Sequence, residues 1–384
     1  MKNLLYIVAF ACLCSCKHSS VKVKPDAIAE SEEFHYRTLS GEEKANYAAA
    51  VKRMYDSMLG NHGFNGSILV AKNGEILFED YHGFSDLHTK DTISPNTPFH
   101  LASTSKTFTG MAIMKLSEER KLNLDDSLQV FFPQFPYLGI TVRMLLSHRS
   151  GLPNYVYFMP ADPEWKHRLA TNTDMLQFMQ EKKPPIYNYP NRGFHYCNTN
   201  YALLALIVEK VSGQPFPDYL KNTIFTPLGM THTFVFSKKD SADYHPSYQY
   251  NNRPFTLEPM DCVYGDKNVY STPRDMLLWD KAIYSNRIVS QATYEEATQP
   301  NSNERPSMHN YGLGWRLMIM PNATKIVYHN GWWHGNNTCF TRLVADTATI
   351  IILGNKFNKG IYAGMKLATI FNNSKKTEVQ KPDE

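Results

Sequence analysis

The chain has 384 residues, of which 42% are hydrophobic and 20% are charged, as is ordinary for a globular protein. The net charge of +4 is too small to indicate a nucleic-acid-binding protein, so we expect no nucleic-acid partner. The length suffices for one large domain or two smaller ones.

The N-terminus has the features of a bacterial export signal. Lys2 gives a positive start, and the apolar run over residues 4–14 has the length of a signal-peptide core. This run is too short to span a bilayer, which takes about 20 residues. Leu13-Cys14-Ser15-Cys16 is similar to a lipobox, which predicts a signal peptide over residues 1–15 and a lipid on Cys16 that anchors an exported lipoprotein to the membrane. A plain secretory signal cleaved nearby is the alternative.

The other cysteines indicate neither a disulfide scaffold nor a metal site. Cys197, Cys262 and Cys339 are odd in number and widely spaced. A single disulfide stays open at this point. The chain has no His-x-His or His-Glu-x-x-His pair, which argues against a metallohydrolase. We expect no metal and no cofactor.

The first predicted elements are a helix and a hairpin. Residues 16–40 are polar and are predicted to be a tether. Ser40-Gly41-Glu42-Glu43 is a capping box, and apolar residues recur at helical spacing behind it, which predicts a helix to about Leu59. Two strands, residues 66–71 and 75–81, flank Asn73-Gly74, a strong short signal for a β-hairpin.

The middle of the chain has helical patterns, and its last part returns to strands. Helices are predicted at residues 140–148, at 200–211 and from Thr272 onward. Strands are predicted at residues 311–318, 325–328, 339–344 and 349–353, before a final helix at 361–371. The economical assembly is an α+β fold, with an antiparallel β-sheet flanked by helices and an inserted all-helical subdomain. We place the folded domain at 41–375, with its sheet part at 41–120 and 306–375, its helical subdomain at 121–305, and a polar tail at 376–384.

Ser103 and Lys106 are the first candidates for chemistry. They lie three residues apart at the start of a nearly all-apolar run, which predicts a buried helix on which both share one face. Gly110 continues this face and leaves room for another element. A serine hydroxyl needs a neighbouring base, and a lysine can be that base where burial and a nearby cation favour its neutral form. The spacing alone is weak, since it recurs in the polar stretch at residues 19–22 and an N-cap serine is the plain alternative.

Two further motifs follow. Tyr196-Cys197-Asn198 precedes a predicted helix, where a tyrosine can share proton transfer with a lysine and an asparagine can bind a substrate amide. Tyr189 and Tyr250 show the same Tyr-x-Asn spacing, so the loop-to-helix position is what favours Tyr196. His329-Asn330-Gly331 is expected to end a strand, where glycine lets a ligand approach the backbone. The N–H groups of Trp332 and Ser103 are candidates for an oxyanion hole.

These three motifs, in this order, resemble those of the serine β-lactamase-like family, the class C β-lactamase, D-alanyl-D-alanine carboxypeptidase and esterase type. The segments at residues 140–153 and 226–230 match the family as well. The resemblance covers about residues 66–355. It implies an antiparallel sheet with flanking helices and an all-helical subdomain, with the active site between them.

The resemblance also implies roles for the motif residues. Ser103 would be the nucleophile that forms an acyl-enzyme, which water then hydrolyses. Lys106 and Tyr196 would activate Ser103 and move protons, and either can be the base. Asn198 would orient the substrate. The N–H groups of Ser103 and Trp332 would bind the oxyanion.

His329 departs from one branch of the family. Class C β-lactamases usually carry a lysine there that helps to bind the substrate carboxylate, whereas carboxypeptidases and esterases often have histidine. We therefore expect a carboxypeptidase-like or esterase activity, with β-lactamase as the alternative, and a role for His329 in carboxylate recognition through titration near pH 6.5. The expected partner is a small-molecule or peptide substrate: a peptidoglycan-type peptide, an ester or a β-lactam. A non-catalytic penicillin-binding sensor or scaffold is the alternative of another class, and His148 is expected to be structural.

Overall fold

The computed structural model describes residues 34–371. The predicted signal peptide, Cys16, the tether up to residue 33 and the tail at 376–384 fall outside the described residues. Within residues 34–371, no helix combines the length and the apolar character that crossing a bilayer requires.

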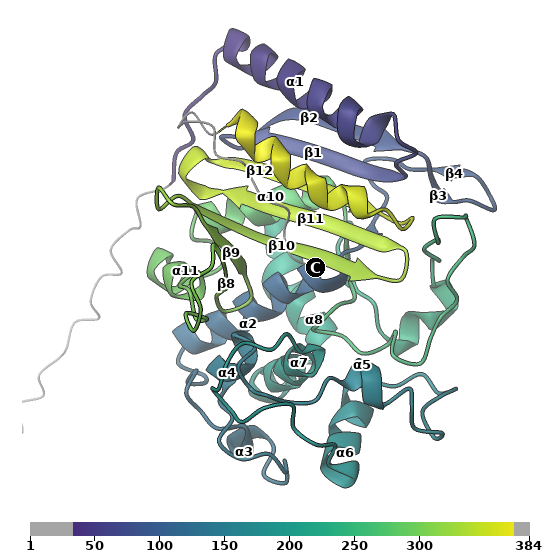
Figure 1. The fold of residues 1–384 in the computed structure, drawn as a ribbon, viewed down its shortest axis with the longest axis vertical. Helices are drawn as coiled ribbons and strands as arrows, with labels where there is room; N and C mark the ends of the chain where they lie inside the picture. The colour runs from purple at the N-terminus through teal and green to yellow at the C-terminus, as the bar shows by residue number, and fades with distance from the viewer. Residues whose placement is uncertain (1–33, 372–384) are drawn as a thin grey trace, which may run out of the picture. The chain divides into compact units, whose positions relative to one another are not determined.

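A seven-stranded antiparallel sheet lies at the centre of the fold, in the order β2-β1-β12-β11-β10-β9-β8 (Figure 1). β1 pairs with β12, so strands from the two ends of the chain are neighbours, as predicted, and the residues between them form an insertion. The strands of this sheet are β1 (Gly66–Lys72), β2 (Glu75–His82), β8 (His309–Tyr311), β9 (Arg316–Ile319), β10 (Lys325–Trp333), β11 (Asn336–Leu343) and β12 (Ala348–Gly354).

Helices cover both faces of this sheet. On one face lie α1 (Gly41–Tyr55) with its extension η1 (Asp56–Gly60) and the C-terminal helix η6 (Lys359–Ile370), drawn in purple and yellow in Figure 1. On the other face α10 (Pro273–Tyr284) packs on β1 and β12, and α2 (Lys106–Glu118) belongs to the same buried core. Alternate residues of β1 point to opposite faces of the sheet. Ile68 and Val70 belong to the core on the side of α1 and η6, and Leu69 and Ala71 belong to the core on the side of α2 and α10.

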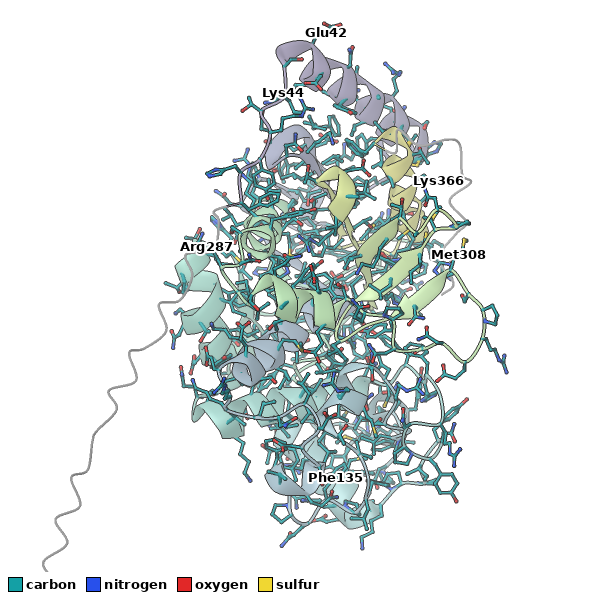
Figure 2. All side chains as sticks on the ribbon, turned by 90° about the vertical axis from the view of Figure 1, so that its left-hand side faces the viewer. Glu42, Lys44, Phe135, Arg287, Met308 and Lys366 are labelled. Atoms are coloured by element: carbon teal, nitrogen blue, oxygen red, sulfur yellow. The ribbon has the colours of Figure 1, made fainter. Side chains whose placement is uncertain are left out.

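The insertion is built around α7 (Asn198–Ser212), which contacts α2 and four helices of the insertion. Figure 2 shows side chains filling this part, with Phe135 near its end. Its other helices are α3 (Leu128–Phe131), α4 (Val142–Leu146), α5 (Tyr155–Phe158), α6 (Asn172–Lys182), α8 (Phe216–Leu220), η3 (Lys221–Phe225), α9 (Thr226–Leu228), η4 (Lys238–Asp243) and α11 (Gln291–Ala297).

The prediction of an all-helical subdomain at 121–305 is wrong in detail. β6 (Phe234–Val235) and β7 (Val269–Ser271) form a small sheet with β5 (Phe99–His100), and α10 belongs to the layer on the main sheet. Strands of two or three residues are too short to show an alternating pattern. The same holds for the two-stranded sheet of β3 (Phe84–Asp86) and β4 (Asp91–Thr92).

Local signals at the N-terminal end of the domain are confirmed. The Ser40 side chain and Glu43 form the reciprocal capping box of α1. Asn73 and Gly74 both have positive φ, 49° and 70°, as the tight turn between β1 and β2 requires. The end of the predicted tether is not free, however. Leu39 is buried, and Asn73 Nδ2 donates to the Arg37 carbonyl at 2.8 Å, so these residues pack on the hairpin.

The single strand predicted over residues 311–318 is two strands, β8 and β9, with a sharp turn between them. Gly314 has a φ of 96°, and a Cβ on Gly312 would lie 2.2 Å from the Ala297 carbonyl oxygen. Close packing therefore selects both glycines. The turn also meets Gly110 of α2, where a Cβ would lie 3.0 Å from the Leu313 carbonyl, so the predicted role of Gly110 is confirmed.

Candidate active site

Ser103 lies in η2 (Ala102–Ser105), a 3-10 turn that leads directly into α2. Ala102 has a φ of 49°, in the left-handed region that non-glycine residues seldom adopt. Its N–H donates to His100 Nδ1 at 3.0 Å, and His100 Nε2 lies 3.1 Å from Asn268 Oδ1. These side chains hold the strained residue immediately before Ser103 in place.

The absence of a side chain at Gly331 lets the turn that carries Ser103 pack directly against β10. A Cβ on Gly331 would lie 2.3 Å from the Leu101 carbonyl oxygen and 3.0 Å from Ala102 Cβ. The motif does not end its strand as expected, because β10 continues to Trp333, and the glycine makes room for the turn of Ser103 rather than for a ligand. Residues preceding Ser103 and Trp332 are therefore packed together, which supports the pairing of their N–H groups as an oxyanion hole; that pairing stays a prediction.

Lys106 is fully buried and surrounded by neutral oxygen atoms. Its Nζ lies 3.1 Å from Ser103 Oγ, 2.9 Å from Asn198 Oδ1 and 2.7 Å from the Asp266 carbonyl oxygen. The amide and carbonyl oxygens can only accept, so they take two hydrogens of the amine. The serine hydroxyl can donate to the remaining lone pair of a neutral amine. The geometry suits proton transfer from Ser103 to Lys106.

Tyr196 and Asn198 join this group, as the motif predicted. Asn198 begins α7, and Tyr196 lies two residues before it. The Tyr196 ring centroid is 4.9 Å from Lys106 Nζ. Four residues thus come together from the junction of η2 with α2 and from the start of α7 with the loop before it: Ser103, Lys106, Tyr196 and Asn198.

His148 contacts the segment at residues 195–197 and helps to hold it in place. Its Nδ1 accepts from the Cys197 N–H at 3.2 Å, its carbonyl accepts from the His195 N–H at 2.8 Å, and its ring lies 4.3 Å from that of Tyr196. Burial, together with the charge of Lys106, holds the pKa of His148 well below its usual value, so the ring is neutral. These contacts fit the expected structural role.

His329 requires a correction. Its side chain is fully buried, its Nδ1 lies 2.7 Å from the Asn330 carbonyl and therefore carries the hydrogen, and its Nε2 lies 3.1 Å from the Tyr311 hydroxyl. Burial, aided by the charges of Arg316 and Lys106, holds the pKa of His329 well below 6.5. A neutral imidazole with both nitrogens occupied cannot offer a charge to a substrate carboxylate, so the expected titration near pH 6.5 is wrong.

The Trp332 side chain does not line the site with its neighbours. It is 61% exposed, and its Nε1 donates to the His334 carbonyl at 3.0 Å. Only its backbone N–H remains a candidate for substrate binding.

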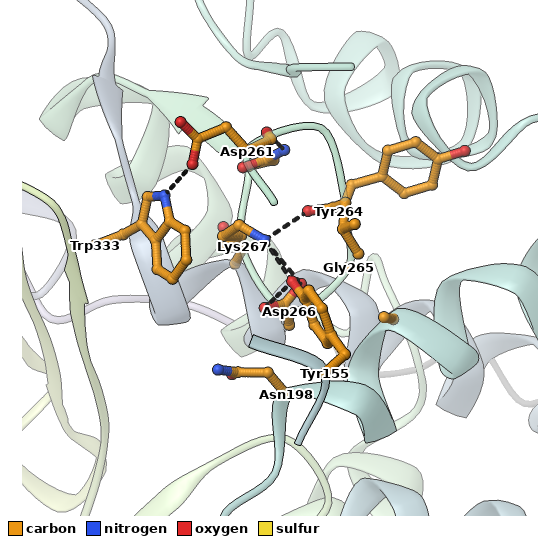
Figure 3. Close-up of polar contacts among 12 residues, drawn as sticks. Tyr155, Asn198, Asp261, Tyr264, Gly265, Asp266, Lys267 and Trp333 are labelled. Atoms are coloured by element: carbon orange, nitrogen blue, oxygen red, sulfur yellow. Dashed lines mark hydrogen bonds and ion pairs between the residues drawn. The ribbon is translucent and has the colours of Figure 1, made fainter. Parts of the chain in front are cut away.

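A charged network beside Lys106 was missed in the sequence (Figure 3). Asp266, Lys267 and Tyr155 are all buried, and the Tyr155 hydroxyl lies 3.0 Å from Asp266 Oδ2 and 2.5 Å from Lys267 Nζ. The Trp333 Nε1 donates to Asp261 Oδ1 at 2.8 Å nearby. An adjacent Asp-Lys pair in an apolar stretch was the available signal, because such residues are seldom buried without a partner.

Arg316 of β9 was also missed. Its guanidinium carbon lies 5.2 Å from the centroid of the Tyr196 ring, and its side chain is half-buried. No carboxylate among residues 34–371 pairs with it. Nothing in the sequence around Arg316 indicates a functional residue, because a single arginine in a strand is common.

Cys197, Cys262 and Cys339 are free and buried, so the disulfide left open is not formed among them. In the part of the chain that the structure describes, no three His, Cys, Asp or Glu side chains gather as metal ligands would.

Comparison with known proteins shows the family. The Beta-lactamase family model matches residues 51–367. Penicillin-binding protein 4* of Bacillus subtilis is 34% identical over 329 residues, covering 82% of this chain and 73% of that protein. The putative penicillin-binding protein PbpX of Bacillus subtilis is 29% identical over 263 residues, and the match spans 66% of this chain and 62% of that relative.

Solved structures show the same fold. A penicillin-binding protein from Bacillus halodurans has a TM-score of 0.73 at 23% identity, with 84% of this chain and 98% of that chain covered. The D-amino acid amidase of Ochrobactrum anthropi SV3, solved with L-phenylalanine amide, has a TM-score of 0.70 at 23% identity, with 85% and 99% covered. The chain belongs to the β-lactamase family, whose members are serine hydrolases.

Proposed function

We propose that the protein hydrolyses peptides with a free C-terminal carboxylate, as a D-alanyl-D-alanine carboxypeptidase does. The observation that carries this proposal is Arg316. A half-buried guanidinium beside Tyr196, with no acidic partner among the described residues, is suited to an anion supplied by the substrate. Its planar, permanently charged group can bind both oxygens of a carboxylate. Penicillin, which the name of the similar penicillin-binding protein 4* says that protein binds, also carries a carboxylate.

The chemistry follows from the contacts of Ser103. Lys106 takes the hydroxyl proton as Ser103 Oγ bonds to the carbonyl carbon, and the N–H groups of Ser103 and Trp332 stabilise the oxygen anion. The C–N bond then breaks, and the leaving amine receives that proton from Lys106, directly or through Tyr196. Water then attacks the ester carbonyl and gives its proton to Lys106, which passes it to Ser103 Oγ as the C–O bond breaks, so that the acid leaves and the serine hydroxyl is restored. The carboxylate that Arg316 would bind is that of the leaving C-terminal residue, whose amine is released when the C–N bond breaks.

A matched pair of substrates tests this proposal: an acyl-D-Ala-D-Ala peptide and the same peptide with a C-terminal amide. Arg316→Met should lower kcat/KM for the acid about 10- to 100-fold, the loss of a charged hydrogen bond, and change that for the amide by less than about 3-fold. Arg316→Lys should recover part of the loss. Arg287→Met, which removes a surface arginine, is the matched control. Equal losses on both peptides would contradict the proposal.

The remaining activities are separated by a panel with a short-chain ester, a D-amino acid amide and a chromogenic cephalosporin. A kcat/KM highest for the ester would favour an esterase, and one highest for the cephalosporin a β-lactamase. Stable labelling by a fluorescent penicillin without turnover of any substrate would favour a sensor. The contact between Lys106 Nζ and Ser103 Oγ argues for an enzyme.

We also propose that the protein is an exported lipoprotein, on the strength of Leu13-Cys14-Ser15-Cys16. The full-length chain should fractionate with membranes, and Cys16→Ala should be released from them. Equal partitioning of the two would contradict lipid attachment at Cys16.

A further inference from the structure

Phe194 is an exposed aromatic residue beside the group proposed to bind the substrate carboxylate. It is 41% exposed, and its ring centroid lies 5.6 Å from that of Tyr311. Tyr311 pairs with Arg316 across β8 and β9, and the guanidinium carbon of Arg316 lies 5.2 Å from the centroid of the Tyr196 ring. The Tyr196 and Tyr311 ring centroids are 6.4 Å apart. Phe194, Tyr196 and Tyr311 therefore form an aromatic wall next to Arg316.

The loop that carries Phe194 is held in place before any substrate binds. Three backbone hydrogen bonds of 2.8–2.9 Å join it to residues 148–151, donated by the N–H groups of Tyr187, Asn191 and His195 to the carbonyls of Gly151, Arg149 and His148. The Arg149 side chain also donates to Asn191 Oδ1 at 2.7 Å. The Phe194 ring lies 5.9 Å from the ring of buried His148. An apolar surface that is already fixed loses little conformational freedom when a ligand contacts it.

The leaving residue of a peptide bound as proposed lies against this wall. Its carboxylate is at Arg316 and its amine nitrogen is at Ser103, and both groups are bonded to one Cα. The Tyr196 ring spans the same interval, since its centroid is 4.9 Å from Lys106 Nζ and 5.2 Å from the Arg316 guanidinium carbon. The side chain on that Cα therefore emerges beside the aromatic wall. Tyr311 is only 1% exposed, so the accessible apolar surface next to it is that of Phe194.

We propose that Phe194 is a specificity-determining residue, which selects peptides whose leaving residue carries an apolar side chain larger than that of alanine. Contact with the Phe194 ring removes the apolar surface of such a side chain from water, and a single methyl group has little surface to remove. An exposed apolar side chain is ordinary by itself, and the position of Phe194 beside Tyr196 and Arg316 is what carries the inference. The inference rests on the proposed function, because the carboxylate at Arg316 places the side chain.

Two peptides that differ only in the leaving residue test the inference: acyl-D-Ala-D-Leu and acyl-D-Ala-D-Ala. The measured quantity is the ratio of their kcat/KM values, D-Leu over D-Ala, because a displaced Tyr196 would slow both reactions and cancel in the ratio. The wild-type ratio should be about 10, at the low end of what added methylene groups contribute in an apolar pocket. Phe194→Ala should lower this ratio to about 1 or 2. Phe194→Leu keeps an apolar side chain and should retain most of it.

Two further variants separate the contact from other effects. Tyr250→Ala removes another exposed aromatic ring, one that is 74% exposed in the turn at residues 249–252, and should leave the ratio unchanged. Arg316→Met should lower kcat/KM for both peptides and also leave the ratio unchanged, because both carry the same carboxylate. The role of Arg316 and the role of Phe194 are thereby measured separately.

A wild-type ratio near 1, or a ratio that stays at its wild-type value in Phe194→Ala, would overturn the inference while carboxypeptidase activity stands. Cleavage of neither peptide by the wild type would overturn the proposed function, and the inference with it. Phe194→Gln is the second variant if Phe194→Ala does not fold by circular dichroism. Its polar end should lower the ratio in the same way.

Discussion

The hydroxyl of Tyr311 lies 3.1 Å from Nε2 of His329, and both side chains are buried. Because Nδ1 of His329 already donates to the Asn330 carbonyl, Nε2 accepts from the tyrosine, and the imidazole is neutral. The third motif therefore shapes the wall of the site without carrying its positive charge. Arg316, on the neighbouring strand β9, places a permanent positive charge beside Tyr196.

Preference for a carboxylate-bearing peptide over its amide should not change between about pH 5.5 and 8. His329 stays neutral over this range, since burial holds its pKa well below 6.5, and an arginine stays charged. The ratio of the two kcat/KM values is the measurement, because titration of a shared base cancels. A ratio that falls as pH rises would restore His329 as the carboxylate-binding group.

His329→Lys should destabilise the protein. The ammonium would be buried beside Tyr311 with no acidic partner, which should lower the free energy of unfolding by about 3 kcal/mol or more. Urea denaturation measures the loss, and His82→Lys, at an exposed position in β2, is the matched control. Equal stability of the two variants would show that position 329 is open to solvent.

Ser103 should be the single site of acylation. Intact-mass measurement after treatment with a β-lactam or a phosphonate should show one adduct, and peptide mapping should place it on Ser103. The nearby hydroxyls are engaged elsewhere: Ser105 Oγ accepts from the Val269 N–H, and Thr104 Oγ1 lies 2.9 Å from Thr338 Oγ1. An adduct that persists in Ser103→Ala would refute the assignment.

Lys106→Ala should lower kcat/KM by at least about 10²-fold, the loss typical of a general base. Among residues 34–371, Lys106 is the one amine that contacts Ser103 Oγ. Asn198→Ala removes one of those contacts and should have a smaller effect at high substrate concentration. An unchanged rate in Lys106→Ala would assign the base to Tyr196.

Local sequence signals predicted well wherever one short stretch decides the structure. The capping box at Ser40, the Asn73-Gly74 turn and the pairing of Ser103 with Lys106 each depend on residues at most four apart. The positions of Arg316 and Lys267 near the site depend instead on which strand or loop lies beside α2. Arg316 comes 210 positions after Lys106 in the chain, so no local pattern marks it.

The misassignment of His329 has a physical cause too. From the sequence, the motif position implied a side chain facing a ligand, but burial is set by Tyr311 and by the Ser103 turn that packs on β10. The same packing explains Gly331, which was expected to make room for a ligand and instead makes room for the turn before Ser103. A glycine in a strand indicates close approach, and the sequence does not say whether a ligand or the backbone of the protein approaches.

His100 should make the protein less stable in acid. Burial lowers the pKa of His100 to about 4 in the folded protein, whereas in the unfolded chain the imidazole has its usual pKa near 6.5. Between these two pH values the unfolded chain binds a proton at His100 that the folded protein does not bind. The stability that the neutral ring contributes is present above pH 6.5 and falls by about 3 kcal/mol as the pH drops toward 4. Urea denaturation at pH 7, 5.5 and 4 should show a smaller pH dependence for His100→Asn. The same dependence in both proteins would mean that His100 is accessible to protons when folded.

Gly331→Ala should impair both folding and catalysis, because the added Cβ would lie 2.3 Å from the Leu101 carbonyl oxygen, a backbone atom that cannot rotate away. Either β10 or the turn that carries Ser103 must move. Overpacking of this kind lowers the free energy of unfolding by about 1–3 kcal/mol, and a displacement of about 1 Å at the nucleophile lowers kcat/KM about 10²-fold. Gly41→Ala is the control: no atom lies within 4 Å of its added Cβ, so its stability should change by less than about 1 kcal/mol. Urea denaturation and the rate of Ser103 labelling separate the two effects. Wild-type values of both in Gly331→Ala would show that the turn and the strand are not in contact, and the oxyanion hole built on that contact would then have to be formed by other groups.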